Sequence, residues 1–400
     1  MSGKGSFQDL LVVELASVLA GPSVGQFFAE MGATVIKVEN LRTSGDVTRS
    51  WKLSTEPPEA QVSAYFASAN WGKQSVCVDL TSQEVREALY SIIKKADVVL
   101  VSFKPGDAEK LQMDYERLST MNSSLIYGHV TGYGKDVPRA GYDAVLQAEA
   151  GFMYLNGEPD GPPVKMPVAL IDLLAAHQLK EGMLAALYLR ERTGKGQYVE
   201  VSLLRTAIAS LANQATNFLV AGKAPERMGS EHPNIVPYGT VFKTADHKEL
   251  VLAIGDDRQF KTLCQVLGAP ELADRPEFRS NKDRVRHRSE LKPLLKELIA
   301  GQERESLLQT LIDNHVPAGA VHTIPEALRQ PLAQPQILSS QGMLGVRQIA
   351  FQVAGGPELT IDRPPLLGQH TWHVLTAVAG LKEEQLHELA QNQLIYPYSP

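Results

Sequence analysis

The stretch that decides the fold is LLVVELASVLAGPSVGQFFAEMGATVIKVE, residues 10–39. It begins with an apolar run, continues with a helical segment that opens at Pro22, and returns to a second apolar run at Thr34–Val38. Proline suits the first turn of a helix, and a glycine such as Gly32 is typical of a helix end. Two buried strands joined by one helix form a βαβ unit, so this stretch predicts the start of a parallel sheet.

The same alternation continues to about residue 150. Further apolar strands are predicted at Val98–Val101 and Leu125–Val130, and an amphipathic helix precedes the first of them. The second strand leads into a Gly-rich turn, Thr131-Gly132-Tyr133-Gly134. We therefore predict an α/β fold whose large domain holds a Rossmann-like, doubly wound parallel sheet.

A second, smaller α+β domain is predicted after this sheet. A long helix follows Asp172, a strand covers Gln197–Ser202, and a further helix leads into the Gly- and Pro-rich segment Gly222–Pro237. The predicted organisation is a large domain over residues 1–205, a linker helix and loop over 206–237, a small α+β domain over 238–325 and a C-terminal segment over 326–400.

Composition excludes several functional classes. The 400 residues include 39 basic and 45 acidic side chains, a formal charge of -6, which argues against the basic surface of a nucleic-acid binder. Cys77 and Cys264 belong to no metal-ligand pattern, and the histidines near residue 370 lack a third ligand, so no metal site is predicted. No secretory signal and no apolar run of membrane-spanning length are visible. We expect a cytoplasmic protein without membrane or nucleic-acid partners.

Dinucleotide binding is the first activity that an opening βαβ unit suggests. Glu39 ends the second strand where a nicotinamide site wants an acid, but the glycines after the first strand, Gly21 and Gly25, do not have the GxGxxG spacing. Nicotinamide binding is therefore disfavoured. Another phosphate-bearing ligand at the start of this helix stays open.

Asp172 is the second candidate, because it interrupts apolar residues on both sides. An aspartate at the start of a helix is most often an N-cap. The alternative is a carboxylate nucleophile that the helix N-terminus helps to keep ionised. The residues alone leave both readings open, and the two are compatible.

The chain resembles the class III CoA-transferases, also called the CaiB/BaiF family, over nearly its whole length. The motifs that carry the resemblance are short and occur in the same order. They are Leu19-Ala20-Gly21-Pro22, Gly32–Glu39, Gly45-Asp46 with Arg49, Asn70–Ser75, Phe103-Lys104-Pro105-Gly106, Thr131–Gly134, Gly141-Tyr142-Asp143, Asp172, Thr193–Gln197, Ser202-Leu203-Leu204 and Pro365–Thr371.

The resemblance implies a reaction and an assembly. Asp172 matches the family's covalent nucleophile, which takes CoA from an acyl-CoA to a free carboxylic acid through an acyl-aspartyl anhydride and an aspartyl-CoA thioester. CoA is then a substrate, and no permanently bound cofactor is implied. Members of the family form interlocked homodimers, in which the C-terminal segment returns to the Rossmann-like domain.

The resemblance also implies CoA contacts. Positive charge for the phosphates would come from Arg42, Lys73 and Lys110. Tyr142 would approach the reacting centre. The further implied CoA contacts are Val18, Leu19, Asn40 and Phe103.

Three alternatives accompany this interpretation. Formyl-CoA transfer is disfavoured, because that group has glutamine where this chain has Leu19. The 2-methylacyl-CoA racemases share the fold but place a histidine base where this chain has Tyr142, and a tyrosine is a poor base at neutral pH. A catalytically idle CoA-binding protein would need only an N-cap at position 172.

The acceptor acid is suggested by the segment Gly229–Tyr238. This segment is similar to one found in family members that use short dicarboxylates, and it is equally well read as a Pro-rich loop between domains. If the loop faces the site, His232 could pair with an acceptor carboxylate.

Overall fold

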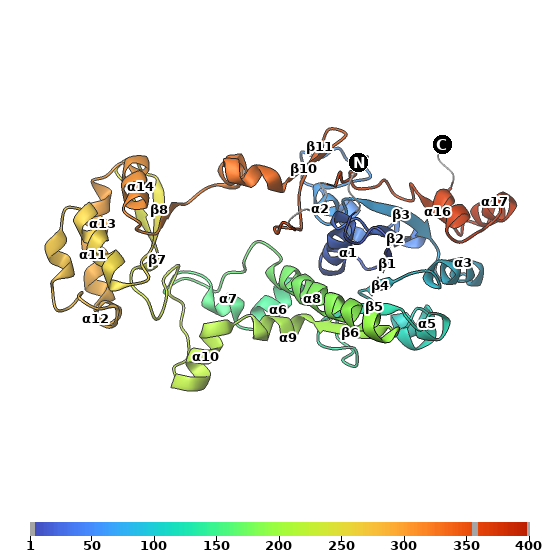
Figure 1. Cartoon of the computed structure of the whole chain (residues 1–400), viewed down its shortest axis with the longest axis horizontal. Coiled ribbons are helices and arrows are strands. Elements are labelled where there is room, and N and C mark those ends of the chain that lie inside the picture. The colour runs from blue at the N-terminus through green and yellow to red at the C-terminus, as the bar shows by residue number, and fades with distance from the viewer. Residues whose placement is uncertain (1–4, 354–358, 398–400) are drawn as a thin grey trace. The chain divides into compact units, whose positions relative to one another are not determined.

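The computed structural model describes residues 5–353 and 359–397, and the chain forms two compact units (Figure 1). The larger unit comprises Met1–Ala150, Pro167–Ala215 and Pro335–Pro400. The smaller unit comprises Gly151–Met166 and Thr216–Gln334. Both units are therefore assembled from segments that are separate in the sequence.

A six-stranded sheet forms the centre of the larger unit. The strand order is β3-β2-β1-β4-β5-β6, and every neighbouring pair is parallel, which confirms the predicted doubly wound α/β class. The order reverses direction between β1 and β4, which is where such sheets bind ligands. The strands are β1 (Leu11–Leu15), β2 (Thr34–Asn40), β3 (Lys73–Val78), β4 (Val98–Val101), β5 (Ile126–Thr131) and β6 (Gln197–Ser202).

Helices cover both faces of this sheet (Figure 1). On one face α1 and α8 pack against each other and against the strands. On the other face α3, α5, α16 and α17 enclose an apolar core with alternate strand residues such as Val13, Ile36 and Val99. The helices are α1 (Ala20–Glu30), α2 (Ala64–Ala67), α3 (Gln83–Ile93), α4 (Asp107–Lys110), α5 (Tyr115–Met121), α6 (Asp143–Glu149), α8 (Leu170–Thr193), α9 (Leu203–Ala209), α16 (Thr371–Ala377) and α17 (Glu383–Gln391).

The C-terminal segment covers the outer edge of β3. The amide of Ser75 donates to Nδ1 of His370 at 3.1 Å, and the amide of Cys77 donates to Oγ1 of Thr371 at 3.0 Å. Further along, the amide of Tyr396 donates to the carbonyl of Cys77 at 2.8 Å. An open edge strand would present these groups to other chains, so the returning segment satisfies them within the unit. A β-hairpin of β10 (Ile337–Ser340) and β11 (Met343–Val346) precedes this return.

The smaller unit is an antiparallel three-stranded sheet packed against helices, which confirms the predicted α+β class. Its strand order is β7-β8-β9, and Phe242, Leu250 and Phe260 belong to its apolar core. The elements are α7 (Phe152–Leu155), β7 (Tyr238–Lys243), β8 (Glu249–Ala253), α11 (Asp257–Val266), α12 (Asn281–Arg286), α13 (Arg288–Ala300), α14 (Arg304–Asp313), β9 (Ala318–Ala320) and α15 (Ile324–Arg329), while α10 (Ala212–Ala221) spans the boundary at Ala215.

Two helix starts differ from the sequence-based expectation. Helix α1 begins at Ala20, two residues before Pro22, and helix α8 begins at Leu170, two residues before Asp172. In α8 the N-cap residue is Ala169, whose side chain cannot cap. Asp172 therefore lies inside the first turn and is not the N-cap.

Within residues 5–353 and 359–397, no helix has the length and apolar character that a membrane span requires.

Candidate active site

A cavity of about 420 Å³ lies at the carboxyl ends of β1, β4 and β5, at the point where the strand order reverses. Its walls come from the loops after these strands, from the start of α6 and from the first turn of α8. It is lined by Ser17, Val18, Leu19, Ala20, Gly21, Val47, Trp51, Ser102, Phe103, Lys104, Pro105, His129, Val130, Thr131, Gly132, Gly134, Lys135, Arg139, Ala140, Gly141, Tyr142, Asp143, Asp172 and Leu203.

Asp172 lies in the wall of this cavity with its carboxyl group unpaired. Its side chain makes no hydrogen bond or ion pair with any described residue. Burial, followed by the charge of Asp143, raises the pKa of Asp172 to about 7. Asp172 is half-buried. A carboxylate with neither a cation nor a donor beside it is costly to remove from water even in part, and such groups are concentrated at functional sites.

The side chain of Asp143 provides the hydrogen bond at the start of α8 that an N-cap side chain would normally provide. One of its carboxylate oxygens, Oδ1, accepts a hydrogen bond from the amide of Ile171 at 2.8 Å, and Oδ2 accepts one from Nε2 of Gln147 at 2.8 Å. Asp143 thus caps the start of α8 from another helix. It also fixes a negative charge beside Asp172, which explains part of the raised pKa.

Two glycines bring the loop after β5 against the start of α6. A Cβ atom on Gly132 would lie 2.5 Å from the amide nitrogen of Gly141, and one on Gly141 would lie 2.4 Å from Cα of Gly132. Only glycine allows the two backbones to approach this closely. The contact positions Tyr142 and Asp143 at the cavity.

Five of the predicted site residues meet in this cavity. Asp172 is joined by four of the expected CoA contacts, which are Val18, Leu19, Phe103 and Tyr142. Tyr142 is 63% exposed, so its ring is accessible to a ligand. Residues from the loops after β1 and β4, from the N-cap of α6 and from the first turn of α8 therefore converge although they are far apart in the sequence.

Three other predicted contacts lie outside the cavity wall, two of them at or just after the end of β2 and one at the end of α4. The side chain of Asn40 accepts a hydrogen bond from the amide of Arg42 at 3.0 Å and caps a short 3-10 turn. The Arg42 guanidinium is exposed and pairs with Asp79 at 2.7 Å. Lys110 is also exposed, with Asp107 at 3.4 Å.

Lys73 does not have the placement expected of a phosphate ligand. Its side chain is fully buried, and Nζ lies 2.7 Å from Oε2 of Glu14. The same ammonium donates to the carbonyl of Pro22 at 2.8 Å and to Oδ1 of Asn70 at 2.9 Å. These three partners occupy the donors of the Lys73 ammonium, which lies in the interior next to the start of α1. Lys73 is therefore not placed to contact CoA directly, and this expectation is corrected.

His232 belongs to the smaller unit. Its Nδ1 atom accepts a hydrogen bond from the amide of Asn234 at 3.1 Å, and its ring packs edge-on against Tyr238. Burial and the nearby Arg288 lower the pKa of His232. The imidazole is therefore held in its neutral form within the loop.

Glu39 is unavailable to a nucleotide ribose. It is 3% exposed, and its two carboxylate oxygens each lie 2.7 Å from a guanidinium nitrogen of Arg49. The hydroxyl of Ser75 donates to Oε1 at 2.6 Å. The Glu39 carboxylate is therefore already engaged where a nicotinamide site would use an acid for the ribose.

Sequence reasoning missed several residues of the cavity. Lys104 is exposed in its wall and forms no ion pair with the described residues. Trp51 packs edge-on against Tyr65 with ring centroids 5.0 Å apart, and burial followed by the charge of Asp172 raises the pKa of Tyr65. Lys104 follows Phe103 in a quoted motif and could have been found, whereas Trp51 carries no local signal.

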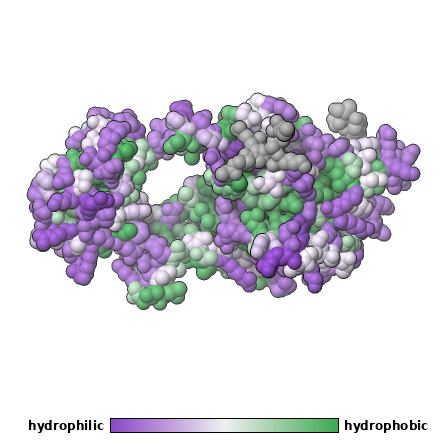
Figure 2. All heavy atoms as spheres, viewed as in Figure 1, coloured by the Kyte–Doolittle hydropathy of each residue, from purple (hydrophilic) through white to green (hydrophobic). Residues whose placement is uncertain are grey.

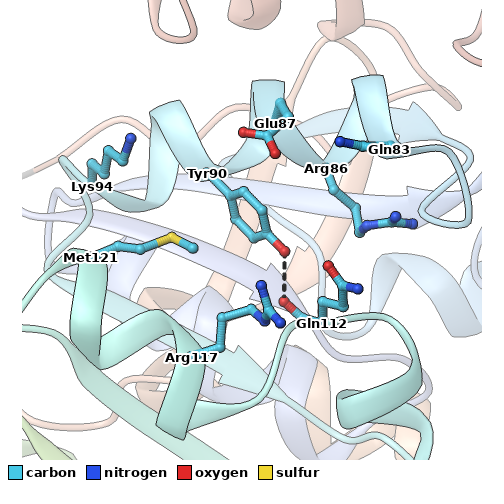
Figure 3. A pocket seen from close by; sticks show the side chains of 8 residues that line it. All are labelled: Gln83, Arg86, Glu87, Tyr90, Lys94, Gln112, Arg117 and Met121. Carbon is cyan, nitrogen blue, oxygen red and sulfur yellow. Dashed lines mark hydrogen bonds between the residues drawn. The ribbon is translucent and has the colours of Figure 1, made fainter.

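A second cavity, of about 300 Å³, lies between α3 and the segment around α5 (Figure 3). The hydroxyl of Tyr90 donates to the carbonyl of Gln112 at 3.0 Å across it, and the Arg86 guanidinium is bound to the carbonyls of Leu80 and Thr81. None of the residues predicted for the site lines this cavity. Its walls are formed by Gln83, Arg86, Glu87, Tyr90, Lys94, Gln112, Arg117 and Met121.

No cluster of three or more His, Cys, Asp or Glu side chains that could hold a metal ion occurs in the described part of the chain. The first cavity therefore offers a carboxylate with a raised pKa, together with basic side chains and aromatic rings.

Comparison with known proteins places this arrangement in a family. The model of CoA-transferase family III matches residues 7–371. A succinate–glutarate CoA-transferase from Agrobacterium fabrum is 38% identical over 393 residues, which cover 95% of this chain and 97% of the relative. An acetyl-CoA:oxalate CoA-transferase from Acetobacter aceti is 36% identical over 347 residues, covering 85% and 87% respectively.

A solved structure agrees with these sequence matches. The crystal structure of a CAIB/BAIF family protein from Brucella suis superimposes with a TM-score of 0.82 at 37% identity and covers 94% of this chain and all of that one. With a matching family model over most of its length, relatives above 30% identity and a shared fold, this chain belongs to CoA-transferase family III.

Proposed function

We propose that this enzyme moves CoA from an acyl-CoA thioester to a free dicarboxylic acid, with Asp172 as the covalent nucleophile. The observation that carries the proposal is the unpaired Asp172 carboxyl group in the wall of the cavity. Because Asp143 caps α8, capping does not account for an acid at position 172. A catalytically idle CoA-binding protein would have no need of this costly group.

The first half of the reaction forms an aspartyl-CoA thioester. A carboxylate oxygen of Asp172 attacks the thioester carbonyl, a C–O bond forms, the C–S bond breaks, and CoA leaves as a thiolate. The thiolate then attacks the aspartyl carbonyl of the mixed anhydride. A new C–S bond forms, the anhydride C–O bond breaks, and the donor acid leaves as a carboxylate.

The second half repeats these steps with the acceptor. Its carboxylate attacks the aspartyl-CoA thioester and releases the thiolate, which then attacks the acceptor carbonyl of the new anhydride. This gives the new acyl-CoA and restores the Asp172 carboxylate, with no net proton or electron transfer. The anhydrides must be kept from water, and the apolar surroundings that raise the pKa of Asp172 serve that need.

CoA binding is proposed along the lining of the cavity. Val18, Leu19 and Phe103 offer backbone and apolar contacts to the pantetheine arm, and Tyr142 lies beside the reacting centre. Lys104 adds a free cation to the wall, and the exposed Arg42 and Lys110 are the proposed partners of the outer phosphates. In this arrangement Lys73 does not contact CoA but stabilises the turn after β1 through its hydrogen bond to the carbonyl of Pro22.

The acceptor is proposed to be a short dicarboxylate, because relatives named for glutarate and oxalate transfer cover most of this chain. Incubation with succinyl-CoA and glutarate is expected to yield glutaryl-CoA and succinate in equal amounts, measured by liquid chromatography and mass spectrometry of the thioesters. Matched monocarboxylates such as valerate serve as controls and should react at least about tenfold more slowly. Release of free CoA without a new thioester would identify a hydrolase and refute the proposal.

The pH dependence follows from the raised pKa of Asp172. The carboxylate is the reactive form, so kcat/KM is expected to rise with pH and level off above about 7. Asp143→Asn keeps an oxygen to cap Ile171 but removes the charge that raises the pKa of Asp172. Its acidic limb should move to lower pH, so that near pH 6 it retains a several-fold larger share of its plateau activity than the wild type.

Asp143→Ala is the matched control for this pH experiment, because it removes the cap together with the charge. It should show the same displacement of the acidic limb together with a lower stability. A profile of Asp143→Asn that superimposes on the wild type would refute the assignment of the acidic limb to Asp172.

A homodimer, interlocked as in the family, remains our proposal for the assembly. Large apolar side chains at the end of α10 support it, since Phe218, Leu219 and Val220 are 51%, 78% and 81% exposed. This helix forms an apolar projection in Figure 2. Contiguous exposed apolar residues usually mark an interface, and sedimentation of a stable monomer at micromolar concentration would rule the dimer out.

His232 is retained as a proposed contact of the acceptor carboxylate. Its neutral state and its engaged Nδ1 atom leave only Nε2 as a donor for that purpose.

A further inference from the structure

The turn after β1 contains an unusual backbone conformation at Val18. Its φ angle is +72°, and among the described residues it is the only β-branched residue with a positive φ. A branched side chain strongly disfavours this region, so the surroundings must hold the residue there. Val18 lines the cavity and is one of the proposed CoA contacts.

The group that holds Val18 is the carboxylate of Asp46. The amide of Val18 donates to Oδ2 of Asp46 at 3.2 Å and to Oδ1 at 3.4 Å. This contact joins the turn after β1 to the segment after β2. The Val18 N–H therefore points to a carboxylate that is itself buried.

Hydrogen bonds and an ion pair hold Asp46 in place. Its Oδ1 atom accepts hydrogen bonds from the amide and the hydroxyl of Thr48 at 3.0 and 2.8 Å, and its own amide donates to Glu39 at 3.0 Å. The ammonium of Lys37 lies 3.0 Å from Oδ2. Asp46 is 5% exposed, so it does not meet the ligand itself.

The Asp46 carboxylate is one end of a row of four buried, charged side chains. Lys37 also lies 3.0 Å from Oε1 of Glu14, whose Oε2 lies 2.7 Å from Lys73. The charges alternate in sign from Lys73 through Glu14 and Lys37 to Asp46. Although burial by itself would raise the pKa of Asp46, Lys37 and the Thr48 donors lower it, so the carboxylate stays ionised as an acceptor for Val18.

We propose that Asp46 is a positioning residue for CoA binding, acting by holding Val18 in its left-handed conformation so that the turn after β1 is shaped for CoA before the ligand arrives. The proposal rests on the proposed function, because it assumes that CoA lies along this turn. Such preorganisation lowers the cost of binding, so its loss weakens affinity.

The test compares Asp46→Asn in two backgrounds by calorimetric titration with CoA. In the wild-type background, Asp46→Asn should raise Kd roughly ten- to a hundredfold, since the charged acceptor of the Val18 N–H is replaced by a neutral amide whose single oxygen must also serve Thr48. KM for succinyl-CoA should rise in parallel, with kcat changed by less than about threefold. Glycine adopts a positive φ without strain, so in a Val18→Gly background the same Asp46→Asn substitution should raise Kd less than about threefold.

Two further variants separate positioning from a general loss of stability. Thr48→Val removes a hydrogen bond to Asp46 but leaves the Val18 contact, so it should lower stability without weakening CoA binding. Val18→Pro has no N–H to donate and fixes φ near -65°, so it should lose affinity as Asp46→Asn does while the buried charges stay intact.

Three results would overturn the proposal. They are an unchanged Kd for Asp46→Asn, an equal loss in both backgrounds, and normal CoA binding by Val18→Pro. Failure of the wild-type protein to bind CoA would instead refute the proposed function. If Asp46→Asn does not fold, the Val18→Pro titration decides alone.

Discussion

Asp172→Asn is expected to reduce CoA transfer by at least about 10³-fold, because removing a covalent nucleophile removes the reaction path itself. Asparagine has the same shape as aspartate, and the Asp172 side chain makes no hydrogen bond with the described residues, so no packing is lost. The loss should appear in kcat, with the Kd for CoA changed little. The measurement is the initial rate of new thioester formation at saturating substrates.

The stability of Asp172→Asn provides an internal control for folding. The folded pKa of Asp172, about 7, lies above the ordinary value of an unfolded aspartate. Stability from the buried neutral acid is therefore complete at pH values below about 4 and is lost as pH rises through about 7. Asparagine never ionises, so the variant should be more stable than the wild type at pH 7.5, by about 1–3 kcal/mol.

Asp9→Asn is the matched control for this substitution, since Asp9 is an exposed aspartate outside the cavity. It should leave both the rate and the stability unchanged. An Asp172→Asn protein that folds normally and keeps a tenth or more of the wild-type kcat would show that Asp172 is not the nucleophile.

Lys37→Met is expected to destabilise the larger unit by about 3–5 kcal/mol, the usual cost of leaving a buried ion pair without one partner. Lys37 is 1% exposed and lies between the carboxylates of Glu14 and Asp46, each 3.0 Å from Nζ. Methionine preserves the apolar stem but leaves the two acids facing each other. Against a typical total stability of about 5–15 kcal/mol, this loss should lower the yield of folded protein.

Chemical denaturation checks the effect of Lys37→Met, with Lys94→Met as the matched control. Lys94 is exposed at the C-cap of α3, and its replacement should change the free energy of unfolding by less than about 0.5 kcal/mol. A Lys37→Met midpoint equal to that of the control would mean that the buried charges do not support the sheet.

The sheet could be predicted from the sequence because its strands are short apolar runs separated by helical periods and glycine turns. Thr34–Val38 falls within β2 and Val98–Val101 coincides with β4. The docking of the C-terminal segment on β3 could not be derived in this way. It depends on single side chains, such as Thr371 bonded to Cys77, that carry no periodic signal.

The candidate site was predictable to the extent that its residues belong to motifs. Asp172, Phe103 and Tyr142 line one cavity because each follows a strand or lies at the start of a helix at the same edge of the sheet. The role of Lys73 was not predictable, since it depends on Glu14 in a strand that lies two places away in the sheet. The hydrogen bond that satisfies the Ile171 amide at the start of α8 comes likewise from Asp143, a partner that local sequence does not reveal.

The most direct test of the central claim is mass spectrometry of the protein after brief incubation with succinyl-CoA and acid quenching. We predict that the peptide containing Asp172 gains the mass of CoA less one water, the signature of an aspartyl-CoA thioester. Hydroxylamine should convert this adduct to an aspartyl hydroxamate, and Asp172→Asn should acquire neither. Turnover without any adduct on that peptide, or an adduct on another residue, would contradict the assignment of Asp172 as the nucleophile.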